Sequence, residues 1–146
     1  MASSHESPFR LVLRLALVVL MVFAGIAHFV VPGVFTGMVP PQLPSPFLLV
    51  LISGAAEIGL GLGLLHPRLR PRAGQGLIAL YIAVFPANIY MALAEVPLAG
   101  VPTQPWMLWA RLPLQAVFIA WAYAASRPSP TSPLKASVNN SNTNSP

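Results

Sequence analysis

The chain contains no cysteine. This absence excludes disulfide bonds, thiol nucleophiles, and zinc sites or clusters held by thiolates of the chain itself. Charge is also scarce, because only 8% of the 146 residues are charged, against roughly 25% in soluble domains. Hydrophobic residues make up 55% of the chain, and the mean hydropathy is +0.70. These values predict a protein whose surface faces lipid.

Acidic residues are the scarcest charged type, with three Asp and Glu against eight Lys and Arg. The resulting pI near 10.9 is typical of many nucleic-acid-binding proteins. Here, however, the basic residues stand at the ends of apolar runs and do not share one face, as membrane topology signals do. We therefore do not expect nucleic acid as a partner.

Four apolar runs are long enough to cross a bilayer, which takes about 20 residues. They cover about residues 10–31, 47–65, 75–94 and 106–125. The first run is longer than the roughly 7–15 residues of a signal-peptide core, which favours a retained span. The sequence thus predicts an all-α, polytopic membrane four-helix bundle as one domain over residues 10–125. Residues 1–9 form a short polar N-terminus, and the Ser-, Asn- and Pro-rich residues 126–146 predict a disordered tail.

Prolines separate the predicted spans. Residues 32–46 hold five prolines and no charge, so we expect a structured, non-helical loop there, because proline lacks a backbone donor. Residues 66–74 contain three arginines and two turn-forming prolines, and they predict a tight basic loop. Pro86 is expected to interrupt the third span, and residues 95–105 form a second proline-rich loop.

The positions of the positive charges predict the topology. Cytoplasmic segments carry the excess of Lys and Arg, and seven of the eight basic residues then mark one side of the membrane. These are Arg10, Arg14, Arg68, Arg70, Arg72, Arg127 and Lys135. We therefore expect a multi-pass protein of the bacterial inner (plasma) membrane with both termini in the cytoplasm. The exception is Arg111, inside the fourth span.

Two ionisable residues lie within predicted spans, where a charge costs about 2.5–3.5 kcal/mol at the membrane centre. Counted from the outer ends at 1.5 Å per residue, Glu57 is roughly 15 Å deep and Arg111 roughly 8 Å deep. The long stem of arginine can close that gap, so we expect a Glu57–Arg111 pair.

Further polar side chains occur in the same outer half of the predicted bundle. His28 ends the first span, Asn88 lies in the third, and Gln115 is one turn below Arg111. The five residues His28, Glu57, Asn88, Arg111 and Gln115 are therefore expected to converge on one interior site. Three interpretations stay open for this site: a structural pair that fixes helix register, a binding site for a small ligand or quinone head group, and a proton path or partner contact.

Small residues in the second span predict close helix packing. Ser53, Gly54, Glu57 and Gly61 recur at helical spacing, and Gly59 with Gly63 forms a G-x-x-x-G motif on a neighbouring face. Glycines at this spacing let transmembrane helices approach closely.

Several of these segments together resemble the DoxX-like family of small four-helix membrane proteins. The resemblance rests on GIAHF at 25–29, MVPPQLP at 38–44, SGAAEIG at 53–59, FPANIYM at 85–91 and RLPLQ at 111–115. It covers roughly residues 10–125 and includes all five polar site residues. The resemblance implies a part of a membrane-associated oxidoreductase complex, since the family is named for a subunit of a thiosulfate:quinone oxidoreductase. More distant animal relatives are assembly chaperones for membrane receptors.

The leading hypothesis is a membrane subunit or accessory protein of a redox system that binds a lipophilic small molecule such as a quinone. Arg111 and His28 would donate hydrogen bonds to a carbonyl, and Glu57 would exchange a proton. Without a cysteine, haem pair or flavin motif, the chain is not expected to be an enzyme in isolation, and no cofactor other than the quinone is expected. The alternative is a non-enzymatic interaction or assembly factor with a structural Glu57–Arg111 pair. Expected partners are membrane lipid, a membrane redox protein or a second copy of the chain.

Overall fold

The computed structural model describes residues 7–96 and 104–127, and this part of the chain is all-helical. Its elements are α1 (Pro8–Val30), α2 (Pro32–Thr36), α3 (Pro46–Gly63), α4 (Arg70–Leu93) and α5 (Pro105–Ser126). Residues 128–146 of the predicted tail and residues 97–103 of the second predicted loop lie outside the described residues, whereas Ser126 belongs to α5. The prediction of an all-α chain is confirmed.

Three of the helices, α1, α3 and α4, are long and apolar enough to cross a membrane. The helix α5 has a comparable length of 22 residues, but Arg111, Gln115 and two prolines make it less hydrophobic. The distribution of side chains also suits lipid: Phe23 is 75% exposed on α1, whereas Arg14 on the same helix is only 3% exposed. Apolar side chains face outward and several polar ones inward, as expected when hydrocarbon surrounds the bundle.

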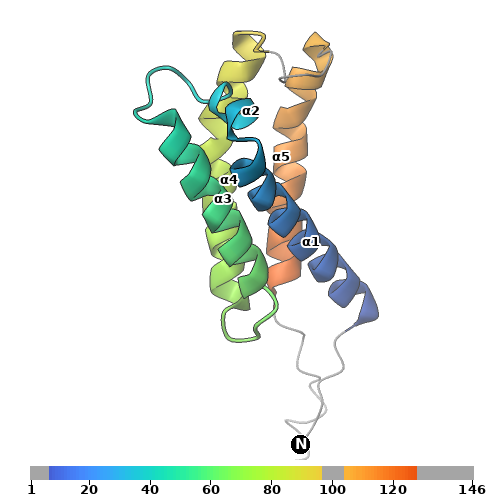
Figure 1. Ribbon diagram of the computed structural model, residues 1–146. Helices are drawn as coiled ribbons and strands as arrows, with labels where there is room; N and C mark the ends of the chain where they lie inside the picture. The colour runs from blue at the N-terminus through green and yellow to red at the C-terminus, as the bar shows by residue number, and fades with distance from the viewer. Residues whose placement is uncertain (1–6, 97–103, 128–146) are drawn as a thin grey trace, which may run out of the picture.

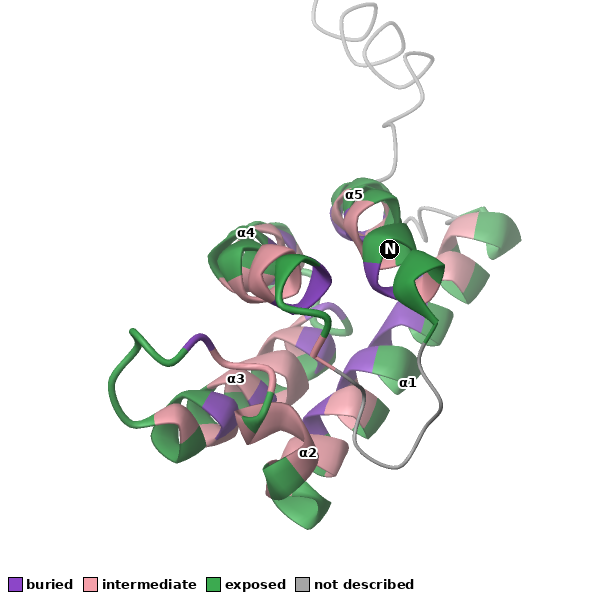
Figure 2. Ribbon diagram, turned by 90° about the horizontal axis from the view of Figure 1, so that it is seen from above, coloured by how far each residue is buried: buried purple, intermediate pink, exposed green. Residues whose placement is uncertain are grey.

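The long helices form two pairs of neighbours. The most extensive contacts join α1 to α3 and α4 to α5, while α3 also touches α4 and α1 touches α5. Seen from above (Figure 2), α3 and α5 stand at opposite corners of the bundle, and within the described residues these two helices make no backbone contact. Each pair is an antiparallel helical hairpin: α1 and α4 end, and α3 and α5 begin, at the same end of the molecule.

The two ends of the bundle, which can be followed in Figure 1, differ in the basic residues that they carry. The start of α1, the connection between α3 and α4, and the end of α5 lie together; this end, with Arg10, Arg68, Arg70, Arg72 and Arg127, is called the basic end. The opposite end carries α2 and is called the α2 end.

The main hydrophobic core lies toward the basic end. It contains Leu17, Val18 and Met21 of α1, Leu64 beside α3, Ala73, Leu77 and Tyr81 of α4, and Ala122 and Ala125 of α5. A second, smaller cluster of Met91, Ala92 and Leu108 joins α4 to α5 at the α2 end. The polar side chains of the predicted site lie on the α2 side of the main core.

The expected effects of three prolines are wrong. Pro32 starts the five-residue helix α2 within the loop predicted to be non-helical, and Pro71 lies in the first turn of α4, which begins at Arg70 and not at Gln75. Both positions suit proline, because the first helical residues have no intrahelical partner for their N–H groups. The helix α4 also continues through Pro86, as transmembrane helices often do when neighbouring helices satisfy the freed backbone groups.

Candidate functional site

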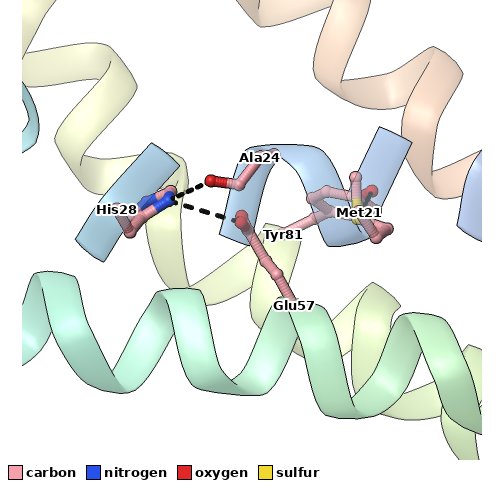
Figure 3. Close-up of polar contacts among 5 residues, drawn as sticks. All are labelled: Met21, Ala24, His28, Glu57 and Tyr81. Atoms are coloured by element: carbon pink, nitrogen blue, oxygen red, sulfur yellow. Dashed lines mark hydrogen bonds and ion pairs between the residues drawn. The ribbon is translucent and has the colours of Figure 1, made fainter. Parts of the chain in front are cut away.

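A buried histidine–glutamate pair joins α1 to α3. The Nδ1 atom of His28 lies 3.5 Å from Oε2 of Glu57, and the two side chains are only 12% and 14% exposed. Figure 3 shows Glu57 reaching from α3 toward His28 on α1. The predicted site residues His28 and Glu57 therefore come together.

Close packing of small residues places this pair. Gly54 and Gly61 are buried on the face of α3 that meets α1, and a Cβ atom at Gly54 would lie 2.6 Å from Cβ of His28. Gly25 approaches the same point, because a Cβ there would lie 2.6 Å from the carbonyl oxygen of Gly54. Because these glycines let the backbones of α1 and α3 approach closely, the imidazole of His28 comes near the carboxylate of Glu57.

The hydrogen bonding of His28 defines its tautomer when the ring is neutral. Its Nδ1 atom lies 2.8 Å from the carbonyl oxygen of Ala24, one turn earlier in α1. A carbonyl only accepts, so Nδ1 carries the proton and Nε2 is an acceptor. Phe35 of α2 covers the ring, with the two ring centroids 3.9 Å apart and nearly parallel.

The carboxylate of Glu57 is incompletely satisfied. Its Oε2 atom is buried and has no hydrogen-bond partner among the described residues, although His28 stands beside it. A buried polar atom of this kind costs about 1–3 kcal/mol when it lacks a hydrogen bond. This oxygen and Nε2 of His28 are two acceptors available to a hydroxyl group.

A second polar pair joins α4 to α5. Asn88 Nδ2 donates to Oε1 of Gln115 over 2.8 Å, and Gln115 Nε2 donates to the carbonyl oxygen of Tyr81. Gln115 is ten residues from the start of α5, and Glu57 is eleven residues from the start of α3. Each hairpin thus has one buried polar pair at a similar distance along its second helix.

The expected Glu57–Arg111 pair is wrong. Arg111 instead donates from Nη1 to the sulfur of Met91 over 3.4 Å. The physical reason is the arrangement of helices: α3 and α5 are diagonal neighbours, so comparable depths in the membrane do not bring the two side chains together. The five predicted site residues therefore form two pairs and a separate arginine, and do not converge.

Tyr81 lies between the two polar pairs, and it is not among the site residues predicted from the sequence. Its hydroxyl group donates to the sulfur of Met21 on α1 over 3.0 Å, while its carbonyl oxygen accepts from Gln115. The signal that could have identified it is a polar hydroxyl in the middle of a span, seven residues before Asn88. Phe35 and Met91 carried no such signal.

The predicted G-x-x-x-G contact holds only in part. A Cβ at Gly63 would lie 3.0 Å from Cβ of Ala73, but a Cβ at Gly59 would meet nothing within 4 Å. The close approach between α1 and α3 is instead made by Gly25, Gly54 and Gly61, and Gly74 makes a close approach between α4 and α5.

Two further features bear on what the bundle can bind. An apolar groove of about 630 Å³ is lined by α1 and Trp121, from Val12 to Phe23, on the face of α1 that points away from His28 by helical spacing. Within residues 7–96 and 104–127, no three His, Asp or Glu side chains gather as metal ligands would.

Comparison with known proteins gives one match. No curated protein and no solved structure matches the chain. Residues 11–126 match a protein family, and this segment contains α1 to α5 almost entirely together with every residue of the two polar pairs. The chain therefore belongs to the family described as Domain of unknown function (DUF8561).

Proposed function

We propose that this chain is a DoxX-like accessory subunit of a membrane redox system, which binds a lipophilic small molecule such as a quinone at His28 and Glu57. In this proposal α5 is the fourth span, both termini are cytoplasmic, and the protein belongs to a bacterial inner membrane. The span-capable helices and the resemblance of the sequence motifs support this placement.

The observation that carries the proposal is the buried Glu57 oxygen without a hydrogen bond, 3.5 Å from the imidazole of His28. Ionisable residues inside transmembrane segments are rare and usually mark a ligand or ion site. The Nε2 atom of His28 and the carboxylate of Glu57 can accept hydrogen bonds from the hydroxyl groups of a quinol. A protonated Glu57 can in turn donate to a quinone carbonyl.

The test is the amount of quinone that co-purifies in mild detergent, measured by mass spectrometry of an organic extract. We expect the wild-type chain to retain quinone and the variants Glu57→Gln and His28→Phe to retain roughly tenfold less, since a hydrogen bond to a charged group contributes about 1.5–3 kcal/mol. Glu95→Gln is the matched control, because it removes a carboxylate at an exposed position on the end of α4.

Circular dichroism separates a lost ligand from a lost fold. A wild-type chain with no lipophilic ligand, or equal quinone content in wild type and a folded Glu57→Gln variant, would contradict the proposal.

A second candidate is an interaction or assembly factor. The observation that favours it is the open surface around Gly59, where a Cβ would meet nothing within 4 Å, so that a partner helix has room to approach. Crosslinking in native membranes distinguishes the candidates: a stoichiometric protein partner crosslinked through this face, together with an empty His28–Glu57 site, favours the interaction factor.

A further inference from the structure

Arg111 is a cation in α5 whose counter-charge none of the described residues supplies. Its side chain is half-buried, and the sulfur of Met91 at 3.4 Å is its only hydrogen-bond partner among the described residues. A thioether is a weak acceptor, whereas a guanidinium has five N–H donors that match phosphate and carboxylate groups.

The acidic residues of the chain leave few partners for this cation. Only three are present: Glu6, Glu57 and Glu95. Glu57 lies beside His28 and belongs to α3, the helix diagonal to α5. Glu95 forms no ion pair among the described residues, although it is close in the chain to Met91. Glu6 lies outside the described residues. Within the described residues, therefore, no carboxylate of the chain pairs with Arg111, which leaves this cation open to an anion from another molecule.

The position of Arg111 points to the membrane interface. It is six residues after the start of α5, a rise of roughly 9 Å. Helical side chains lean toward the N-terminus of their helix, so Arg111 leans toward the α2 end. Trp106 and Trp109 are exposed near the start of α5, and tryptophan concentrates at the level of lipid head groups. An arginine stem near a helix end reaches that level by extending along the apolar surface.

We infer that Arg111 binds the phosphate of an anionic phospholipid in the leaflet at the α2 end, on the edge formed by α4 and α5. Met91 supports the guanidinium from α4, and the remaining N–H donors face the phosphate. A phospholipid is the occupant that this position favours, because its phosphate lies at the interface while its acyl chains cover the apolar surface of α5. This site is separate from the His28–Glu57 pair; it rests on the proposed placement of α5 as the fourth span, and not on the binding of a quinone.

The experiment uses the full chain in vesicles of phosphatidylcholine that contain a trace of a photoreactive phospholipid. Phosphatidylglycerol with a diazirine in its acyl chain is compared with phosphatidylcholine that carries the same diazirine. After illumination, mass spectrometry of peptides separates labelling at the α2 end of α4 and α5 from labelling at the basic end. We expect the anionic probe to label the α2 end about fivefold more than the zwitterionic probe, as one arginine near an anionic lipid implies.

Matched variants test the residue itself. Arg111→Gln should abolish the excess at the α2 end and leave labelling at the basic end unchanged, whereas Arg72→Gln should leave the excess at the α2 end intact. Arg111→Lys should keep part of the excess. If Arg111→Gln fails to fold, the comparison of the two probes on the wild-type chain decides. The inference would be overturned by equal labelling of the α2 end by the two probes, or by an excess that persists in a folded Arg111→Gln variant. It would also be overturned by a crosslink showing that a carboxylate of a partner protein pairs with Arg111 in native membranes.

Discussion

Glu95 holds an unusual backbone conformation at the end of α4. Its φ angle is 48°, and the N–H of Val96 bonds to the carbonyl oxygen of Met91 over 3.1 Å. This is the Schellman arrangement, in which glycine is the usual residue at the left-handed position. Val96 also packs on the cluster that contains Met91. The chain thus accepts the conformational cost of a non-glycine residue to end the helix where the second hairpin closes.

Replacing this residue should stabilise the protein. We expect Glu95→Gly to raise the free energy of unfolding by about 1 kcal/mol, because the left-handed conformation costs other residues roughly 1–2 kcal/mol. Thermal unfolding in detergent measures the effect. Glu95→Gln is the control, since it removes the charge but keeps the strained conformation, and a gain equal to that of Glu95→Gly would show that charge and not backbone conformation is responsible.

The buried polar residues show how far single residues could be predicted. Residue type and depth identified His28, Glu57, Asn88, Arg111 and Gln115 as buried polar groups in the spans, and the structure brings four of them into two pairs. The pairing partners did not follow from sequence, because depth along a helix says nothing about which helix is adjacent. For the same reason Tyr81, which touches both hairpins, was not assigned to the site.

At the scale of elements, the crossing of α1 and α3 depends on glycine. A Cβ at Gly54 would lie 2.6 Å from Cβ of His28 and 2.9 Å from the carbonyl oxygen of Gly25. Neither atom belongs to the flexible end of a side chain, so the helices themselves would have to separate. The same separation would move His28 away from Glu57.

We therefore expect Gly54→Ala to lower the free energy of unfolding by about 1–3 kcal/mol, the usual cost of overpacking. Gly59→Ala in the same helix is the matched control. It adds the same methyl group where nothing lies within 4 Å, and we expect stability to stay the same or rise by up to about 1 kcal/mol, because alanine favours helix over glycine. Similar losses for both variants in detergent melting experiments would contradict the proposed role of Gly54.

Prolines illustrate a limit of prediction at this scale. Their number indicated loops correctly at residues 37–45, but Pro32 and Pro71 occur in first helical turns and Pro86 inside a continuous helix. A proline's effect depends on whether its missing N–H would have had a partner. That depends on where the helix begins, which composition alone does not fix to within a turn.

At the scale of the whole molecule, two hairpins stand side by side, and Arg10, Arg68, Arg70, Arg72 and Arg127 gather at one end while Arg111 lies toward the other. With the proposed orientation, the connection between α2 and α3 faces outward and the connection between α3 and α4 faces the cytoplasm. Both connections contain exposed residues, Gln42 and Arg68.

The absence of native cysteine makes this topology directly testable. In intact cells we expect a membrane-impermeant maleimide to label Gln42→Cys, and to label Arg68→Cys only after the membrane is permeabilised. The cysteine-free wild-type chain is the control for background labelling. The opposite pattern would place the basic end outside, against the rule that positive residues stay in the cytoplasm.

The sequence by itself determined the apolar character of this protein, its helical class and the positions of the four polar residues that form its two pairs. Apolar runs of bilayer length and the scarcity of charge follow from composition, and each span's polar residues can be read without coordinates. Only the tertiary structure decided which of these residues meet. The diagonal placement of α3 and α5 separates Arg111 from Glu57, and the close packing of α1 and α3 at their glycines brings Glu57 to His28. The physical reason is that side-chain contacts depend on which helices are neighbours and on how closely their backbones approach.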